Sequence, residues 1–253
     1  MNPVERNIQI QAFIDRKDTS GEIYSQAELE FIGSYEGAGG LARKGASGQG
    51  LLHEFYTPDW LCSKMWELAY YHGYSSGAIL EPSCATGRFF KDAPKEETKV
   101  GFEINPVSAR IAQIRYPNAI IYPEYFETAF LQPERYTSLL SKKVTWLDAF
   151  PFSLVISNPP YGKNVNQYSS YFSRPTFQQM ETFFIYHGLR MLKEDGLLVY
   201  VTSSNIIRSG LSYQKQKDHI SELADLVDAY RLPPVFRYSK VPTDIIILRK
   251  KST

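Results

Sequence analysis

From residue 56 onward, short apolar runs alternate with longer segments in which apolar residues recur at every third or fourth position. Short apolar runs bounded by turn residues are typical of buried strands, and the longer spacing is typical of amphipathic helices. The pattern predicts helices within 57–73, 107–117 and 176–196, the first with a Thr-Pro cap and the last with a glycine stop. It predicts strands within 76–89, 99–106, 118–126, 152–162, 197–207, 225–233 and 243–251. This alternation indicates an α/β fold, a doubly wound and mostly parallel sheet with helices on both faces.

The first fifty residues have a different pattern. Residues 1–35 show helical spacing in two segments, IQIQAFIDR and QAELEFIGSY, with a polar break between them. The stretch GAGGLARKGASGQG follows at 37–50, and its glycines are typical of a mobile loop. We therefore expect an N-terminal helical extension and Gly-rich loop at 1–50, and one α/β domain at 51–253.

Composition and charge exclude several classes of protein. The 253 residues have a net charge of +1, so any binding to a polyanion must come from a local basic patch. No apolar run has the length of a membrane span, and the first residues lack the order of a signal peptide. The two cysteines form neither a disulfide framework nor a metal motif, and the four histidines show no ligand spacing. We expect a cytoplasmic protein without a metal site.

Two polar motifs stand where the first two predicted strands end. ILEPSCATGRFF, residues 79–90, places an acid before a small-residue loop that opens a helix, which suits a nucleoside cofactor because the backbone can approach the ligand. A tight turn without a ligand is an equal alternative. FEINP, residues 102–106, follows at a spacing that lets its acid accept two hydrogen bonds from a ribose diol. The alternative is a carboxylate that stabilises the start of the next helix.

A third motif, NPPYG at 158–162, ends an apolar run abruptly, because proline has no backbone donor for a strand ladder. The Asn158 Oδ1 and the Pro159 carbonyl can accept the two hydrogens of an exocyclic amine, and Tyr161 can stack on the ring that carries it. Two such acceptors favour a pyramidal nitrogen, whose lone pair is then free for in-line attack on an electrophile. The alternative is a proline turn that merely ends a strand.

Together with EFYTP (54–58) and the tail VFRYSKVPTDIIILRK (235–250), these motifs make residues 50–250 resemble the S-adenosylmethionine-dependent DNA adenine-N6 amino-methyltransferases. The resemblance is to the NPPY class, in which the cofactor motifs precede the catalytic motif. Members of this class include restriction-modification enzymes and the methylase domains of plasmids, phages and conjugative elements. It implies a Rossmann-like, seven-stranded methyltransferase fold. It also implies methyl transfer from S-adenosylmethionine to the N6 amine of an adenine flipped out of duplex DNA. NPPY is shared with RNA-base and protein-glutamine methyltransferases, so these stay open, as does a catalytically silent DNA-binding subunit.

The resemblance also assigns site residues. Nine would hold the cofactor, at its methionine end, around its amino-acid part, on its ribose and on both faces of its adenine: Thr57, Pro58, Glu81, Pro82, Ser83, Gly87, Glu103, Ile104 and Phe126. Those acting on the target base would be Asn158, Pro159, Pro160 and Tyr161, with Phe236 stacking on the base opposite Tyr161.

Two positions depart from the family pattern. Ala85 stands where the family usually has glycine, and Tyr125 stands where an acid often reads the amine of the cofactor adenine. Both departures predict weaker cofactor binding. Few residues follow TDIIILRK, so we expect no separate target-recognition domain in this sequence. Specificity would then come from a short target, from the first fifty residues with a 37–50 loop that orders on DNA, or from a partner specificity protein.

Overall fold

The computed structural model describes residues 3–37, 55–129, 152–162, 177–208, 214–236 and 241–252. Their helices are α1 (Pro3–Ser20), α2 (Gln26–Gly33), α3 (Asp59–Tyr71), α4 (Pro106–Arg115), α7 (Met180–Met191) and α8 (Gln214–Leu223), with short 3-10 turns η1 (Arg88–Lys91) and η2 (Phe126–Ala129). Their strands are β1 (Ala78–Glu81), β2 (Lys99–Phe102), β3 (Ile120–Tyr122), β4 (Phe152–Ser157), β5 (Leu192–Ser203), β6 (Ala224–Arg231) and β7 (Thr243–Lys250). Within these ranges, none of the helices has the length and apolar character needed to cross a bilayer.

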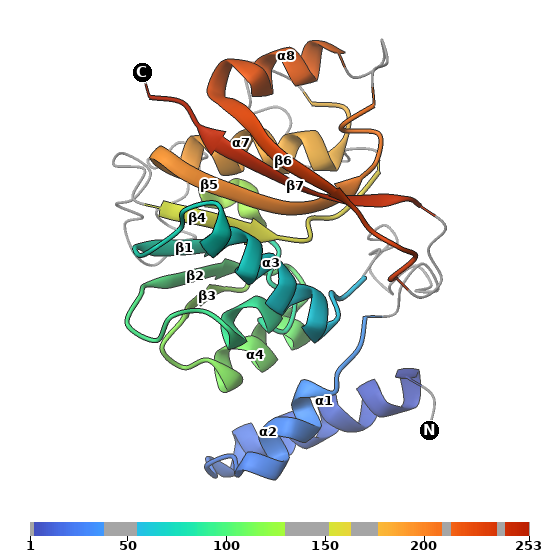
Figure 1. The fold of residues 1–253 in the computed structure, drawn as a ribbon. Coiled ribbons are helices and arrows are strands. Elements are labelled where there is room, and N and C mark those ends of the chain that lie inside the picture. Colours follow the sequence, from blue (N-terminus) through green and yellow to red (C-terminus); the bar gives the residue numbers. More distant parts are fainter. Residues whose placement is uncertain are drawn as a thin grey trace.

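The seven strands form one sheet in the order β3-β2-β1-β4-β5-β7-β6. The strands β1 to β5 pair in parallel, whereas β7 lies between β5 and β6 and runs antiparallel to both. Figure 1 shows the helices distributed over the two sides of this twisted sheet. The predicted doubly wound, mostly parallel, seven-stranded fold with N-terminal helices is confirmed.

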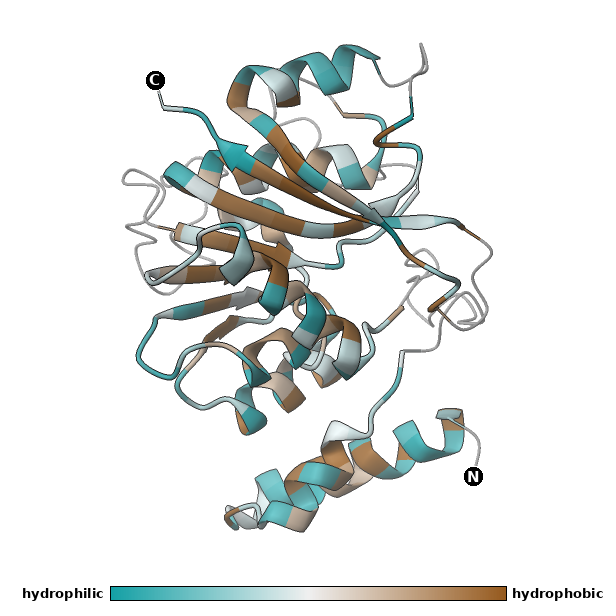
Figure 2. Cartoon of the chain, viewed as in Figure 1, coloured by the Kyte–Doolittle hydropathy of each residue, from teal (hydrophilic) through white to brown (hydrophobic). Residues whose placement is uncertain are grey.

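The central strands are buried on both faces, which explains why they read as continuous apolar runs rather than alternating ones. On β4, Leu154 and Ile156 pack in the cluster that contains α3, while Val155 packs in the cluster that contains α7. Residues of β5 and β7 alternate between the two clusters in the same way. Figure 2 shows these strands as the most hydrophobic ribbons of the molecule. The core is therefore two layers of side chains, one on each side of the sheet.

The N-terminal helices α1 and α2 pack on α4, at the end of the molecule away from β6 and β7 (Figure 1). Their contact is apolar: Ile10, Ile14 and Ile32 are buried in one cluster with Ile111 of α4. A bidentate ion pair between Arg110 and Asp18, at 2.6 and 2.8 Å, lies at the edge of this contact. Both side chains of the pair are partly exposed to solvent, so it adds about 0–1 kcal/mol and the apolar cluster provides most of the docking energy.

Three local predictions were wrong or incomplete. The loop after β1 leads into the 3-10 turn η1 rather than a helix. Helix α7 ends at Met191, well before the expected glycine stop, because the chain passes directly into β5, where Leu192 pairs with Phe152 of β4. Helix α8 was missed, since its polar sequence buries only two side chains. The 37–50 loop, apart from Gly37, lies outside the described residues.

Candidate active site

A pocket of about 810 Å³, measured with its open mouth, lies where β1, β2 and β4 end. Glu81 is the last residue of β1, Glu103 directly follows β2, and Asn158 directly follows β4. Carboxyl ends of neighbouring parallel strands meet at one edge of a sheet, so three segments distant in sequence converge here.

The pocket brings together most of the predicted site residues. Among the described residues, the predicted ones that line it are Thr57, Glu81, Ser83, Glu103, Ile104, Asn158, Pro159, Pro160 and Tyr161. Residues that line it but were not predicted are Phe55, Tyr56, Cys84, Ala85, Arg88 and Phe89. The predicted cofactor and catalytic motifs therefore share one cavity, which is the arrangement that a group transfer between two bound molecules requires.

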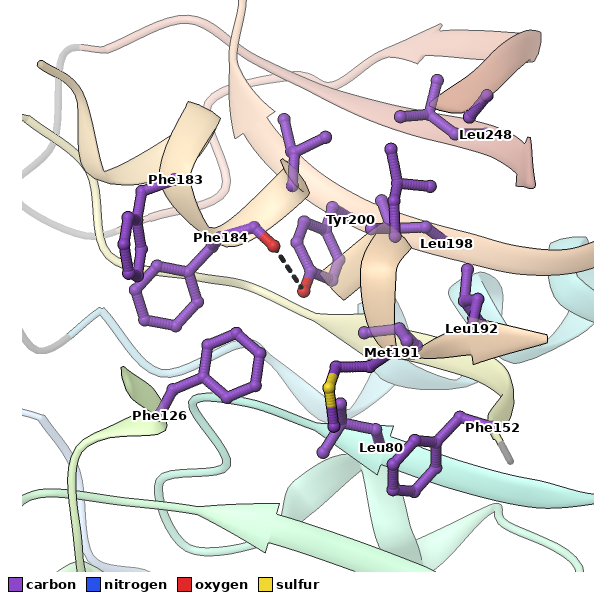
Figure 3. Packing of buried hydrophobic residues seen from close by; sticks show 14 of the residues in the cluster. Leu80, Phe126, Phe152, Phe183, Phe184, Met191, Leu192, Leu198, Tyr200 and Leu248 are labelled. Carbon is purple, nitrogen blue, oxygen red and sulfur yellow. Dashed lines mark hydrogen bonds between the residues drawn. The ribbon is translucent and has the colours of Figure 1, made fainter. Parts of the chain in front are cut away.

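Five predicted residues lie behind the lining. Pro58 is the N-cap of α3, and its carbonyl accepts hydrogen bonds from the first turn. Pro82 is buried beside Glu81. Gly87 has φ +76°, and a Cβ there would lie 2.9 Å from the Tyr116 ring, so glycine is required. Figure 3 shows Phe126 in the core on the α7 side of the sheet, where its ring is 5.4 Å from that of Phe184.

Phe236, the fifth of these residues, is 8% exposed and belongs to the α3-side core cluster. Its ring meets the edge of the Phe55 ring at 6.4 Å, and the half-buried Tyr161 packs against the same cluster. Phe236 therefore lies one layer behind the pocket wall formed by Phe55. Its role as a stacking partner for a base stays a prediction.

The loop after β4 is held by its own side chains. The Asn158 amide donates from Nδ2 to the Phe55 carbonyl at 2.9 Å, and its Oδ1 accepts from the Tyr161 hydroxyl at 2.6 Å. Burial raises the pKa of Tyr161 well above its usual value, and the charge of Glu181 adds to the shift, so the hydroxyl stays protonated and can donate. The two bonds orient the Asn158 amide with its oxygen toward Tyr161.

Glu181 anchors the other end of this loop. Its Oε2 accepts from the Gly162 N–H at 3.1 Å, and its Oε1 accepts from the Ser203 hydroxyl at 2.9 Å. Gly162 also accepts from the Met180 N–H at 2.8 Å and has φ +106°, which only glycine adopts readily. Sequence reasoning missed Glu181, because its partners are 19 and 22 residues away. The signal was a lone acid in the first turn of a mostly apolar helix.

Glu103 organises the small-residue loop in the described structure. Its Oε2 accepts from the Ala85 N–H at 2.8 Å and its Oε1 from the Asn105 N–H at 2.7 Å. Ala85 has φ +46°, a left-handed conformation that favours glycine. The alanine therefore keeps the turn and its N–H contact and carries backbone strain. The Tyr125 carbonyl accepts from the N–H and hydroxyl of Thr128 in η2, and Tyr125 does not line the pocket as described.

We expect Ala85→Gly to raise the free energy of unfolding by about 1 kcal/mol, because glycine adopts the left-handed region without the Cβ clash. Urea unfolding of both proteins measures the change. Asp195→Gly is the matched control, since Asp195 also has positive φ, +60°, and lies in β5 away from the pocket. A loss of stability in Ala85→Gly, with a gain in the control, would contradict strain at Ala85.

Glu81 is a buried carboxyl group at the pocket wall. Its side chain is 2% exposed, and its Oε2 has no hydrogen-bond partner among the described residues. Burial raises the pKa of Glu81 well above its usual value, and the nearby charge of Glu103 raises it further. A buried, unpaired carboxylate oxygen at a pocket wall fits a cationic group of a ligand.

The described residues of the pocket favour neither a cysteine nucleophile nor a bound metal ion. Burial raises the pKa of the Cys84 thiol well above its usual value, and the charge of Glu81 adds to the shift, so Cys84 is a poor nucleophile. In the described ranges, no three His, Cys, Asp or Glu side chains are grouped as metal ligands.

Comparison with known proteins connects this pocket to one family. Residues 97–232, more than half of the chain, match the family described as Eco57I restriction-modification methylase. The chain is 25% identical over 235 residues to the defense against restriction protein B of Escherichia phage P1, covering 91% of this chain and 9% of that protein. It is 27% identical over 190 residues to the type II methyltransferase M.CvrRI of Paramecium bursaria Chlorella virus XZ-6E, covering 69% and 42%.

A solved structure with the same fold is the methyltransferase subunit of a type I restriction-modification system from Streptococcus thermophilus. It superposes with a TM-score of 0.64 at 18% identity over 92% of this chain and 51% of that chain. The chain thus spans less than half the length of the curated relatives it matches. The matched region from 97 to 232 contains Glu103, Asn158 and Tyr161.

Proposed function

The chain belongs to the Eco57I restriction-modification methylase family, and from this premise we propose that it transfers a methyl group from S-adenosylmethionine to the N6 amine of adenine in DNA. The observation that carries the proposal is one pocket that joins two strand-end carboxylates to the oriented Asn158–Tyr161 pair. Target recognition is assigned to elements beyond this pocket or to a partner specificity protein.

The described residues fit the cofactor. S-adenosylmethionine supplies a methyl group activated by a sulfonium and carries an α-ammonium group, an α-carboxylate and a ribose diol. Glu81, at the end of β1, offers an unpaired carboxylate oxygen to the ammonium, and Ser83 of the following loop lines the pocket beside it. Glu103, whose two oxygens also accept from the Ala85 and Asn105 N–H groups, lines the pocket, where a ribose diol can donate to the same carboxylate. The 37%-exposed side chain of Ile104 can cover an adenine face. Thr57 borders the same cavity.

The Asn158 loop supplies the chemistry at the target amine. Oδ1 of Asn158 has two lone pairs, and the Tyr161 hydroxyl uses one of them. The second lone pair and the Pro159 carbonyl accept the two amine hydrogens, which favours a pyramidal nitrogen with a free lone pair. Because Asn158 is held by Phe55 and the loop by Glu181, these acceptors need no reorganisation during the reaction.

The experiment that tests the proposal measures transfer of labelled methyl groups from S-adenosylmethionine. Duplex DNA, single-stranded DNA, RNA and a pool of cell proteins are offered in parallel. We expect label on adenine N6 of DNA. Label on RNA or on protein glutamine instead would replace the proposed substrate, and an absence of both transfer and cofactor binding would point to a silent subunit.

Phe236 separates a base substrate from a glutamine side chain, because only a base has a ring face to stack on. We expect Phe236→Leu to lower the rate of DNA methylation by about 10- to 100-fold, the range for loss of one aromatic stack. Phe152→Leu is the control, since Phe152 is also a buried core phenylalanine but begins β4, at the end of the strand away from Asn158. Equal rates for the two variants would leave Phe236 as a packing residue and remove the support for a base.

A further inference from the structure

Arg88 is the single cation among the described residues that line the pocket. It begins η1, directly after the small-residue loop. Its Nη1 donates to the Thr57 carbonyl at 3.2 Å, and its Nη2 donates to the Tyr35 carbonyl at 3.2 Å. A guanidinium has five N–H donors, so three remain after these two bonds.

Both carbonyls belong to segments that reach the pocket from the N-terminal side. Thr57 lines the pocket, and Tyr35 follows α2 and belongs to the apolar cluster that docks the N-terminal helices on α4. The Tyr35 ring stacks on Tyr56, with centroids 6.1 Å apart, and the Arg88 guanidinium lies 5.8 Å from the centre of the Tyr56 ring. Arg88 therefore joins the small-residue loop to the N-terminal helices at the pocket wall.

The charges of the pocket match those of one ligand class. Its described lining has two carboxylates, Glu81 and Glu103, and one guanidinium, Arg88. A sulfonium amino acid linked to a nucleoside carries two positive groups, the ammonium and the sulfonium, and one negative group, the carboxylate. A guanidinium pairs with a carboxylate in a bidentate geometry that few other side chains allow. Neighbouring cations are directed elsewhere: Lys91 pairs with Asp59 at 3.0 Å, and Arg115 donates to the Thr86 carbonyl.

We propose that Arg88 binds the carboxylate at the amino-acid end of the cofactor, and that its bond to Tyr35 makes the N-terminal helices part of that subsite. The inference rests on the proposed function. It adds a consequence that the function alone does not have. Because Arg88 contacts ligand and helices together, cofactor binding stabilises the docking of α1 and α2, and their docking strengthens cofactor binding by the same factor.

The test compares two ligands that differ in the amino-acid end. S-adenosylhomocysteine has it, and 5′-methylthioadenosine lacks it while keeping the nucleoside and the sulfur. Titration calorimetry on the full chain gives both dissociation constants for the wild type and for Arg88→Met. We expect Arg88→Met to weaken the binding of S-adenosylhomocysteine by about 10- to 100-fold, the range for a lost charge-assisted pair. We expect the dissociation constant of 5′-methylthioadenosine to change by less than about threefold, since this ligand has no carboxylate for Arg88 to bind.

Lys91→Met is the matched control, because it removes a cation from the same 3-10 turn without touching the pocket lining. Equal weakening of both ligands by Arg88→Met would overturn the proposal in favour of a structural role, and so would unchanged S-adenosylhomocysteine affinity. Wild type that binds neither ligand would instead overturn the proposed function itself.

Hydrogen exchange tests the coupling to the N-terminal helices. We expect S-adenosylhomocysteine to slow amide exchange in α2 of the wild type and to leave it unchanged in Arg88→Met, while 5′-methylthioadenosine slows it in neither. Slower exchange in α2 with both ligands, or with neither, would overturn the proposed coupling.

Discussion

Replacing Asn158 with alanine is expected to lower the rate of methyl transfer at saturating cofactor by about 10²–10³-fold, the range for loss of one preorganised polar group in an active site. The variant removes the proposed acceptor for the target amine and leaves the Tyr161 hydroxyl without its 2.6 Å partner. It leaves Glu81, Glu103 and the small-residue loop in place. Cofactor affinity, measured by calorimetry, should therefore change by less than about threefold, because no polar contact of the cofactor is lost.

Asn105→Ala is the control for a loss of stability without a loss of chemistry. Asn105 is the N-cap of α4 and accepts from two backbone N–H groups, so its removal costs about 1 kcal/mol of stability. If both variants turned over at the wild-type rate, Asn158 would have no role in the reaction. A methylation rate that fell together with cofactor affinity in Asn158→Ala would move Asn158 from the target site to the cofactor site.

Replacing Glu81 with glutamine is expected to lower the affinity for the cofactor and to raise the thermal stability of the free protein. We expect Glu81→Gln to weaken the binding of S-adenosylmethionine by about 10- to 100-fold, because the proposed charged hydrogen bond to the cofactor ammonium is lost. At neutral pH we expect the same variant to unfold about 2–4 °C higher, the shift that about 1 kcal/mol produces in a chain of this size. The free protein gains stability because glutamine has no charge to bury beside Glu103.

The pH dependence follows from the raised pKa of Glu81. A group whose pKa is higher in the folded protein contributes its stability fully below its ordinary pKa, and this contribution is lost as pH rises through the folded value. The advantage of Glu81→Gln in thermal unfolding should therefore be absent near pH 4 and grow toward neutral pH. Cofactor binding to the wild type should release a proton over the same pH range, which calorimetry in two buffers of different ionisation enthalpy detects.

Glu127→Gln provides the matched control for this pair of effects. Glu127 is 4% exposed, and burial raises its pKa to about 7, but it lies in η2 and does not line the pocket. It should share the rise in unfolding temperature and keep wild-type cofactor affinity. If Glu81→Gln bound S-adenosylmethionine with wild-type affinity, the cofactor ammonium would not be bound by Glu81.

The positions of the strands and of the polar residues at their ends could be predicted from the sequence, because both depend on local patterns. Burial on both faces makes the centre of β4 (residues 154–156) and of β5 (residues 197–201) continuously apolar, and prolines after Asn158 show where β4 must stop. Parallel strands then place Glu81, Glu103 and Asn158 at one edge without further information. The same local logic failed for η1. It failed also for the end of α7, where pairing of Leu192 with Phe152 of β4 decides the structure.

The contacts that hold the site were not predictable, because they join residues far apart in sequence. Arg88 bonds to carbonyls 31 and 53 residues earlier, and Glu181 bonds to a loop 19 residues earlier. No local pattern marks Arg88 as different from an ordinary surface charge, and the one signal for Glu181 is its place as the only acid of helix α7. Phe126 is assigned to the cofactor adenine by the family resemblance and has its ring in the core between Phe102 and Phe184, so its role toward the cofactor stays a prediction.

The docking of α1 and α2 on α4 also determines where this chain can be shortened. Ile111 of α4 is fully buried and is covered by Ile10, Ile14 and Ile32. A chain that started at residue 55 would present this side of α4 to water as an apolar patch beside the pocket. Such patches drive self-association, so the shortened protein should form soluble oligomers or aggregates at concentrations where the full chain stays dispersed. A minimal version of the methylase must keep its N-terminal helices or replace Ile111 with a polar residue.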